Sequence, residues 1–149
     1  MVRKLGICGL AFSFFLCFAL TVPAKTADDL LNEAKAMVKT VSIDEVKKMI
    51  ESKEKVVLLD VRDMKDYQMG HIPGSVNMPR AISLSGRLLE HHLSKLIPDK
   101  TSKVVVYCDF DTRSPLTVKT MNEIEYKNAV YMKGGSKAWK EAGYPMEKQ

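Results

Sequence analysis

Hydrophobic and polar positions follow two kinds of pattern along the chain. Short continuous apolar runs occupy 56–60 (VVLLD), 103–108 (KVVVYC) and 128–135 (NAVYMKGG), as expected for strands buried on both faces of a sheet. Apolar residues recur at helical spacing in the segments 26–41, 43–50, 84–98, 114–125 and 136–143. A short helical turn after residue 63 and a small strand at 75–78 complete the prediction. Strands that alternate with helices predict an α/β fold in which helices cover both faces of a mostly parallel sheet.

Polar residues at the predicted helix starts support these boundaries. Thr26 and Ser42 each precede an acidic residue by three positions, Asp29 and Glu45, which is the capping-box pattern. Asp63 is placed to cap the short helical turn that follows the strand at 56–60. Pro115 lies in the first turn of the helix at 114–125, where its missing N–H costs nothing. Residues predicted to end helices are Pro98, Gly143 and Pro145.

The first 24 residues differ from the rest. Arg3 and Lys4 precede an uncharged apolar run at 5–22, and Ala24 follows as a small residue suited to cleavage. This arrangement predicts a signal peptide over 1–24, with an uncleaved membrane anchor over residues 5–22 as the alternative. We therefore expect a periplasmic protein, a helical lead-in over 25–40 and one domain over 41–149.

Charge and cysteine content narrow the classes of function. Removing residues 1–24 lowers the formal net charge from +5 to +3, and no arginine- or lysine-rich stripe with interleaved aromatics remains, so a nucleic-acid partner is not expected. Membrane contact is expected only if the leader is retained. Cys108 is the one cysteine after the leader, which excludes an intrachain disulfide and a Cys-x-x-Cys oxidoreductase. The three histidines, His71, His91 and His92, show no zinc-ligand spacing with it.

Cys108 stands where a buried strand meets a short loop and a helix start. Sites in parallel α/β sheets collect at the carboxyl ends of strands. A tight loop can turn its N–H groups inward as an anion site, and the helix N-terminus adds partial positive charge. Such surroundings stabilise the thiolate, which is the nucleophilic form of cysteine. Arg113 adds a planar, fixed charge suited to an oxyanion.

Four segments in order carry a family resemblance. The loop CDFDTRS, 108–114, resembles the Cys-x-x-Gly-x-Arg-Ser loop of single-domain rhodaneses, the thiosulfate sulfurtransferase-like proteins. LLDVR at 58–62, GHIPGSVNMP at 70–79 and KGGSKAWKEAGYP at 133–145 are similar to that family's other motifs. The resemblance covers about residues 40 to 147 and implies the rhodanese-like three-layer fold.

The resemblance also implies a ping-pong sulfurtransferase reaction. Cys108 would take the outer sulfur of thiosulfate or of a persulfide, become a persulfide itself, and pass that sulfur to a thiol or cyanide. Arg113 would orient the donor, and backbone N–H groups of the loop would stabilise the sulfur. No metal or organic cofactor is implied. The loop residues that would form the site are Asp109, Phe110, Asp111, Thr112, Arg113 and Ser114, with Asp60 and Arg62 in support.

Related phosphatases and arsenate reductases are the alternative enzyme classes. Their cysteine and arginine lie one step further apart, because a tetrahedral phosphate needs a wider cradle. Cys108 and Arg113 are five steps apart, which favours a sulfur substrate. A rhodanese-like binding or sulfide-sensing module that has lost turnover is the alternative from another class, and retention of both Cys108 and Arg113 argues against it.

Two aspartates depart from the family pattern. Asp111 stands where the motif has glycine, and Asp109 adds a second negative charge beside the nucleophile. Aspartate tolerates left-handed backbone better than most residues. At about 8 Å and an effective dielectric of about 40, each carboxylate would repel a unit anion by about 1 kcal/mol. We therefore expect thiosulfate to be a poor donor, and the natural donor or acceptor to be less anionic or a protein persulfide.

Four residues have structural interpretations. His71 is expected to fix the GHIPG turn, because a pre-formed thiolate needs no base. Asp60 and Arg62 are expected to form a structural pair near the site. Trp139, at helical spacing, is expected to belong to the core.

Overall fold

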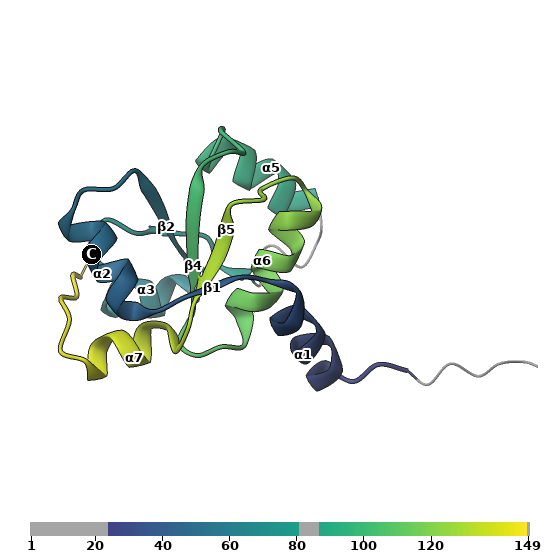
Figure 1. The fold of residues 1–149 in the computed structure, drawn as a ribbon, viewed down its shortest axis with the longest axis horizontal. Helices are drawn as coiled ribbons and strands as arrows, with labels where there is room; N and C mark the ends of the chain where they lie inside the picture. Colours follow the sequence, from purple (N-terminus) through teal and green to yellow (C-terminus); the bar gives the residue numbers. More distant parts are fainter. Residues whose placement is uncertain (1–23, 81–86, 149) are drawn as a thin grey trace, which may run out of the picture.

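The computed structural model describes residues 24–80 and 87–148, and over these residues the α/β prediction is confirmed (Figure 1). Five parallel strands form one sheet in the order β1-β5-β4-β2-β3. The strands are β1 (Thr40–Val41), β2 (Val56–Asp60), β3 (Val76–Asn77), β4 (Lys103–Tyr107) and β5 (Ala129–Met132). The helices are α1 (Ala27–Met37), α2 (Ile43–Glu51), α3 (Met64–Met69), α5 (Arg87–Leu96), α6 (Arg113–Glu123) and α7 (Gly135–Glu141).

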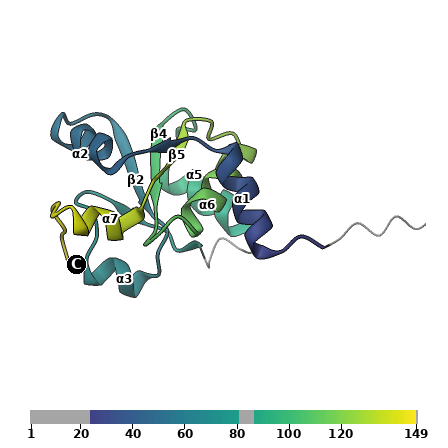
Figure 2. The same cartoon turned by 60° about the horizontal axis from the view of Figure 1, so that its bottom comes forward.

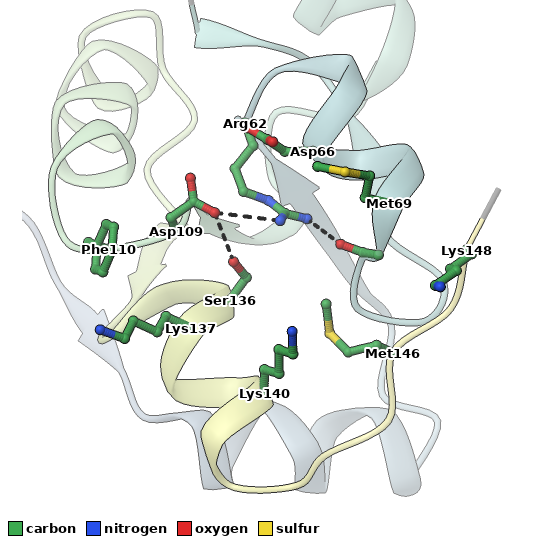
Figure 3. A pocket seen from close by; sticks show the side chains of 11 residues that line it. Arg62, Asp66, Met69, Asp109, Phe110, Ser136, Lys137, Lys140, Met146 and Lys148 are labelled. Atoms are coloured by element: carbon green, nitrogen blue, oxygen red, sulfur yellow. Dashed lines mark hydrogen bonds and ion pairs between the residues drawn. The ribbon is translucent and has the colours of Figure 1, made fainter.

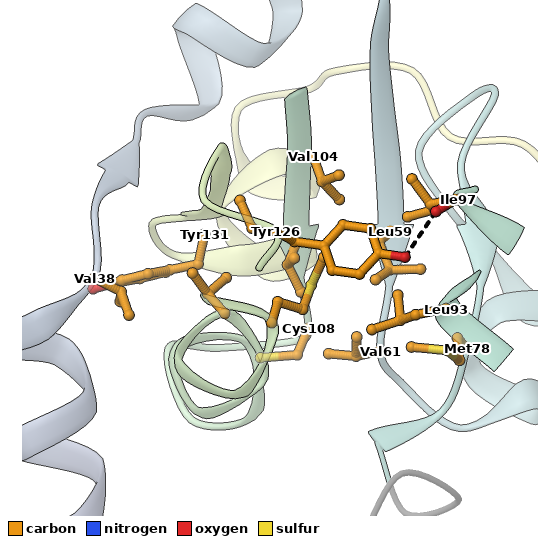
Figure 4. Packing of buried hydrophobic residues seen from close by; sticks show 14 residues of the cluster. Val38, Leu59, Val61, Met78, Leu93, Ile97, Val104, Cys108, Tyr126 and Tyr131 are labelled. Atoms are coloured by element: carbon orange, nitrogen blue, oxygen red, sulfur yellow. Dashed lines mark hydrogen bonds between the residues drawn. The ribbon is translucent and has the colours of Figure 1, made fainter. Parts of the chain in front are cut away.

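Side chains that alternate along the central strands divide the core into two layers. Val104 and Val106 of β4 join a cluster with residues of α5 and α6, and this cluster also contains Cys108 (Figure 4). Val105 and Tyr107 point to the opposite face, where Val46 of α2 and Trp139 of α7 pack. Figure 2 shows α2 and α7 together on this side of the sheet. The sheet is therefore the middle of three layers, and its strands are buried on both faces.

The two predicted capping boxes are confirmed. Thr26 accepts a hydrogen bond from the Asp29 N–H, and Ser42 accepts one from the Glu45 N–H, with each acidic side chain returning to the cap residue's N–H. The capping prediction at Asp63 is wrong in one respect. Asp63 does stand at the N-cap of α3, but its side chain makes no capping hydrogen bond there; its carboxylate lies 3.9 Å from the Arg113 guanidinium instead.

Local pattern missed one element. β1, two residues long, pairs in parallel with β5, and so few residues carry no periodicity. It straddles the boundary predicted between the lead-in at 25–40 and the domain at 41–149, and the helix of the lead-in ends at Met37 and packs against α6. The predicted leader, 1–24, lies almost wholly outside the described residues; within them no helix has the length and apolar character to cross a membrane.

The last described residues are tied back to the segment before β3. His71 and Glu147 exchange two main-chain hydrogen bonds of 2.9 Å. The Glu147 carboxylate also accepts the Gly74 N–H at 2.9 Å and lies 3.1 Å from His71 Nε2. His71 Nδ1 lies 2.9 Å from the Tyr67 carbonyl, and its ring stacks on that of Tyr67. The interpretation of His71 as a turn-fixing residue is therefore confirmed.

Candidate active site

The site lies at the carboxyl edge of the sheet, where β2, β4 and β5 end. Asp60 closes β2 directly beside Tyr107, the last residue of β4, so the segments that follow both strands emerge side by side. Arg62 therefore reaches the loop that begins at Cys108. The segment after β5 leads straight into α7, whose first turn contacts the same loop.

The thiol of Cys108 is completely buried among core residues. Its Sγ donates a hydrogen bond to the Phe110 carbonyl oxygen and lies 3.4 Å from Ser114 Oγ, in the first turn of α6. The expectation that loop N–H groups surround the sulfur differs from the hydrogen bonds found at Sγ, because the Phe110 carbonyl turns toward the sulfur and, with the Ser114 hydroxyl, makes up its partners among the described residues. The Ser114 hydroxyl, also fully buried, is the group beside Sγ that could donate to a thiolate.

The N-terminus of α7 binds the Cys108 loop through main-chain hydrogen bonds. The Ser136 N–H donates to the Cys108 carbonyl at 2.7 Å, and the Lys137 N–H donates to that of Asp109 at 3.3 Å. Gly135 has φ +60°, and a Cβ there would lie 2.3 Å from the Cys108 oxygen. Only glycine permits this approach. Sequence reasoning did not place these residues in the site, although a Gly-Gly pair at a strand-to-helix junction is a pattern that could have found them.

Asp111 occupies the glycine position of the family motif without a left-handed backbone. Among residues 24–80 and 87–148, Lys53 and Glu125 are the non-glycine residues with positive φ. The Asp111 carboxylate accepts the Gly134 N–H at 2.7 Å, which adds a side-chain attachment of the loop to the start of α7. The tolerance of aspartate for left-handed backbone is therefore not used here.

Asp109 is surrounded by donors from three elements. Its Oδ2 lies 2.9 Å from Arg113 Nη2, at the start of α6, and its Oδ1 lies 3.5 Å from Arg62 Nη1. The Ser136 hydroxyl donates to Oδ1 at 3.3 Å (Figure 3). Arg113, expected to orient a donor, thus has Asp109 and Asp63 as its ionic partners in this state. The negative charge of Asp109 is paired, so the repulsion expected from the sequence is reduced.

Asp60 and Arg62 form the predicted structural pair, and the structure shows that it is buried. The Arg62 guanidinium meets the Asp60 carboxylate at 2.6 and 3.0 Å and donates a further hydrogen bond of 2.7 Å to the Gly70 carbonyl. Burial alone would lower the pKa of Arg62, but the hydrogen bonds and charge of Asp60, with smaller contributions from Tyr107 and Asp109, raise it above its ordinary value. Arg62 is therefore a permanent cation that ties α3 and the Cys108 loop to β2.

A hollow of about 500 Å³ opens beside the loop (Figure 3). Asp109 and Phe110 form its loop side, and Arg62 lies at its base. Phe110 is 52% exposed, with Lys137 Nζ 5.2 Å from its ring centre. The remaining wall carries lysines, methionines, an acid and small residues: Asp66, Met69, Gly70, Ser136, Lys137, Lys140, Met146 and Lys148. The hollow thus combines an apolar rim with several cations.

The structure brings all of the predicted loop residues to this edge of the sheet, in unequal roles. Cys108 carries the sulfur, and Ser114 adjoins it. A connected ionic cluster is formed by Asp109, Arg113, Asp60 and Arg62. Thr112 stands at the N-cap of α6 and makes no side-chain capping bond. Trp139 is buried, as predicted, and donates to the Pro145 carbonyl at 2.8 Å, so it supports α7 rather than the site.

This combination of a parallel sheet and a cysteine loop at its carboxyl edge defines a family. The model of the rhodanese-like domain matches residues 42–142, and the chain belongs to that family. The match lies within the range 41–149 predicted for the domain.

Named relatives agree with the family. The chain is 32% identical over 113 residues to a probable adenylyltransferase/sulfurtransferase of Mycobacterium tuberculosis, covering 76% of this chain and 27% of that protein. It is 26% identical over 108 residues to the thiosulfate:glutathione sulfurtransferase of Saccharomyces cerevisiae, covering 68% of this chain and 78% of that one. The chain thus spans about a quarter of the first relative's length.

Solved structures show the same fold. A Rhodopseudomonas palustris protein of unknown function, described as a possible tyrosine phosphatase, has a TM-score of 0.73 and 27% identity, covering 85% of this chain and 97% of that one. Thiosulfate sulfurtransferase of Pseudomonas aeruginosa has a TM-score of 0.67 and 28% identity, covering 82% of this chain and 22% of that one. The predicted three-layer fold is therefore confirmed.

Proposed function

We propose that the protein moves sulfane sulfur through a persulfide on Cys108. With thiosulfate, the Cys108 thiolate attacks the outer sulfur, the S–S bond of thiosulfate breaks with its electron pair on the leaving group, and sulfite departs. The persulfide on Cys108 is then attacked at its outer sulfur by cyanide or a thiolate. Thiocyanate or a new persulfide leaves, and Cys108 returns as the thiolate.

The position of Cys108 carries this proposal. Its sulfur lies at the carboxyl end of β4 and 3.4 Å from Ser114 Oγ in the first turn of α6, where helix N–H groups supply partial positive charge. A carbonyl oxygen accepts a proton from a thiol but repels a thiolate. Ionisation therefore requires the Phe110 carbonyl to turn away from the sulfur, while the Ser114 hydroxyl stays in place to donate to it.

The relatives support the choice of donors and acceptors. One is named for thiosulfate and glutathione, a small anionic thiol. The hollow beside the Cys108 loop has cations and methionines on its walls, which suits a thiol with carboxylates on an organic stem. We propose that the thiol acceptor approaches through this hollow, with no metal or organic cofactor taking part.

Intact-mass spectrometry tests the proposal. The purified protein is treated in turn with thiosulfate, a polysulfide and an organic persulfide. We expect a gain of one sulfur atom that is absent in Cys108→Ser and is removed by cyanide with release of thiocyanate. If no donor adds sulfur to the native protein, the binding or sulfide-sensing module replaces the enzyme as the better account.

Phosphatase activity is the competing reaction, because one structural neighbour is described as a possible tyrosine phosphatase. The step of five residues between Cys108 and Arg113 argues against it, since the shorter loop leaves less room for a phosphate. Moreover, Arg113 is paired with Asp109. We expect no turnover of p-nitrophenyl phosphate above that of Cys108→Ser. Turnover that depends on Cys108 would reverse the order of the two proposals.

We also propose that residues 1–24 direct export and that the domain acts in the periplasm. The basic start, the apolar run at 5–22 and small Ala24 support this location. Cell fractionation of the full chain, with mass determination of the mature N-terminus, tests it. A mature form that begins near Lys25 supports cleavage, a membrane-bound full-length form supports the anchor, and a cytoplasmic form refutes export.

A further inference from the structure

The groups best suited to bind an oxyanion donor are already bound to a carboxylate of the protein itself. The Asp109 carboxylate receives Arg113, Arg62 and the Ser136 hydroxyl at 2.9, 3.5 and 3.3 Å. Asp109 directly follows Cys108, and Arg113 directly precedes Ser114, whose hydroxyl lies 3.4 Å from the sulfur. These donors come from the start of α6, the segment after β2 and the start of α7, so they converge on one carboxylate from three sides.

Counting charges shows that nothing positive is left over in this cluster. The two guanidinium groups of Arg62 and Arg113 face the three carboxylates of Asp60, Asp109 and Asp63. Thiosulfate carries two negative charges, and its leaving group is an oxyanion that needs donors as the S–S bond breaks. Thiosulfate must therefore displace Asp109, or its sulfite leaving group must depart without hydrogen bonds from the Arg113 guanidinium.

We propose that Asp109 is an internal counter-anion that selects the sulfur donor. While it holds Arg113, thiosulfate is disfavoured, and organic persulfides, whose leaving group is a thiolate without oxyanion oxygens, are the preferred donor class. This inference rests on the proposed persulfide chemistry of Cys108. For such a donor, the Cys108 thiolate attacks the outer sulfur of R–S–SH. The S–S bond of the donor breaks, R–S⁻ leaves with the electron pair, and a persulfide with its proton remains on Cys108.

Asp109 and Asp111 have different roles in this account. The Asp111 carboxylate is bound to the Gly134 N–H and pairs with no guanidinium among the residues that the structure describes. Selection therefore depends on occupation of Arg113 and not on negative charge in general. Asp66 provides the matched control, because it places an equal charge in the same hollow and pairs with no arginine in the described part of the chain.

The experiment compares two donors on the native protein and on Asp109→Asn, Asp109→Ser and Asp66→Asn. The donors are thiosulfate and the hydropersulfide of 2-mercaptoethanol, and the readout is kcat/KM for transfer to cyanide with sulfur loading of Cys108 followed by mass. For both Asp109 variants we expect kcat/KM with thiosulfate to rise about fivefold, as releasing one partly exposed ion pair allows. With the hydropersulfide it should change by less than about twofold, and Asp66→Asn should shift the donor ratio by less than about twofold.

Each other outcome overturns the inference. A thiosulfate rate that does not rise in either Asp109 variant, or rises equally with both donors, refutes donor selection by Asp109 while the Cys108 persulfide stands. An equal rise in Asp66→Asn would show that charge alone is responsible. If neither donor loads Cys108 in any form of the protein, the proposed function fails and takes this inference with it.

Discussion

Replacing Gly135 by alanine should displace the Cys108 loop. Gly135 has φ +60°, and an added Cβ would lie 2.3 Å from the Cys108 oxygen and 2.6 Å from the Asp109 oxygen. Left-handed backbone costs an alanine about 1 kcal/mol or more. Both oxygens belong to the main chain and cannot rotate away, so the loop must move by about 1 Å and weaken its bond from the Ser136 N–H, for about 2 kcal/mol more.

Gly143→Ala provides the matched control, since Gly143 has φ +71° and nothing lies within 4 Å of its added Cβ. Urea unfolding, followed through fluorescence of the single buried tryptophan, should show a loss of about 3 kcal/mol for Gly135→Ala and about 1 kcal/mol for Gly143→Ala. Sulfur loading of Cys108 should slow by about 100-fold in the former, as a 1 Å displacement allows, and stay near the native rate in the latter.

Equal losses of stability in the two alanine variants would refute the contact between Gly135 and the Cys108 loop. Native loading kinetics in Gly135→Ala, with its stability reduced as expected, would refute the link between loop position and sulfur chemistry. The two measurements therefore test packing and function separately.

Three further substitutions test supports of the site and of the fold by urea unfolding. Asp60→Asn leaves the buried Arg62 charge without its partner and should cost about 3 kcal/mol; a loss below about 1 kcal/mol would contradict the pairing. Tyr107→Phe removes the hydroxyl that accepts the buried Ile72 N–H at 3.2 Å and should cost about 1–2 kcal/mol, with the sulfur-loading rate unchanged. Hydrogen bonds from the side chain and backbone of the cap residue Ser42 hold the pKa of Glu45 below its unfolded value of 4.5. Glu45→Gln should therefore lower the stability above pH 4.5, and this loss should vanish as the pH falls through the lower folded pKa. A loss that persists in acid would contradict this.

Much of the fold was predictable because its determinants are local. Continuous apolar runs located β2 and β4, and the acidic residues three positions after Thr26 and Ser42 located two helix starts within one residue. The loop from Cys108 to α6 followed from the same reasoning. What local pattern could not give is β1, whose pairing with β5 joins residues some ninety positions apart.

The partners of the site's charged groups were the harder part. Arg113 was expected to face a donor, and Asp109 to repel one, because spacing along the chain reveals neither Arg62 nor Ser136 beside Asp109. Both residues approach from the ends of other strands, so their contact depends on the finished sheet. The carbonyl of Phe110 beside the sulfur likewise depends on how one peptide plane is rotated, which residue types alone do not determine.

One wall of the hollow can change without disturbing the rest. Lys148 is an exposed residue of this wall, whereas Cys108 is immobilised by the packing of the core. A substitution of Lys148 would alter the charge presented to an incoming molecule at little cost to folding. The choice of incoming molecule can thus change by substitution at such an exposed position of the hollow, while Cys108 and its surroundings stay fixed.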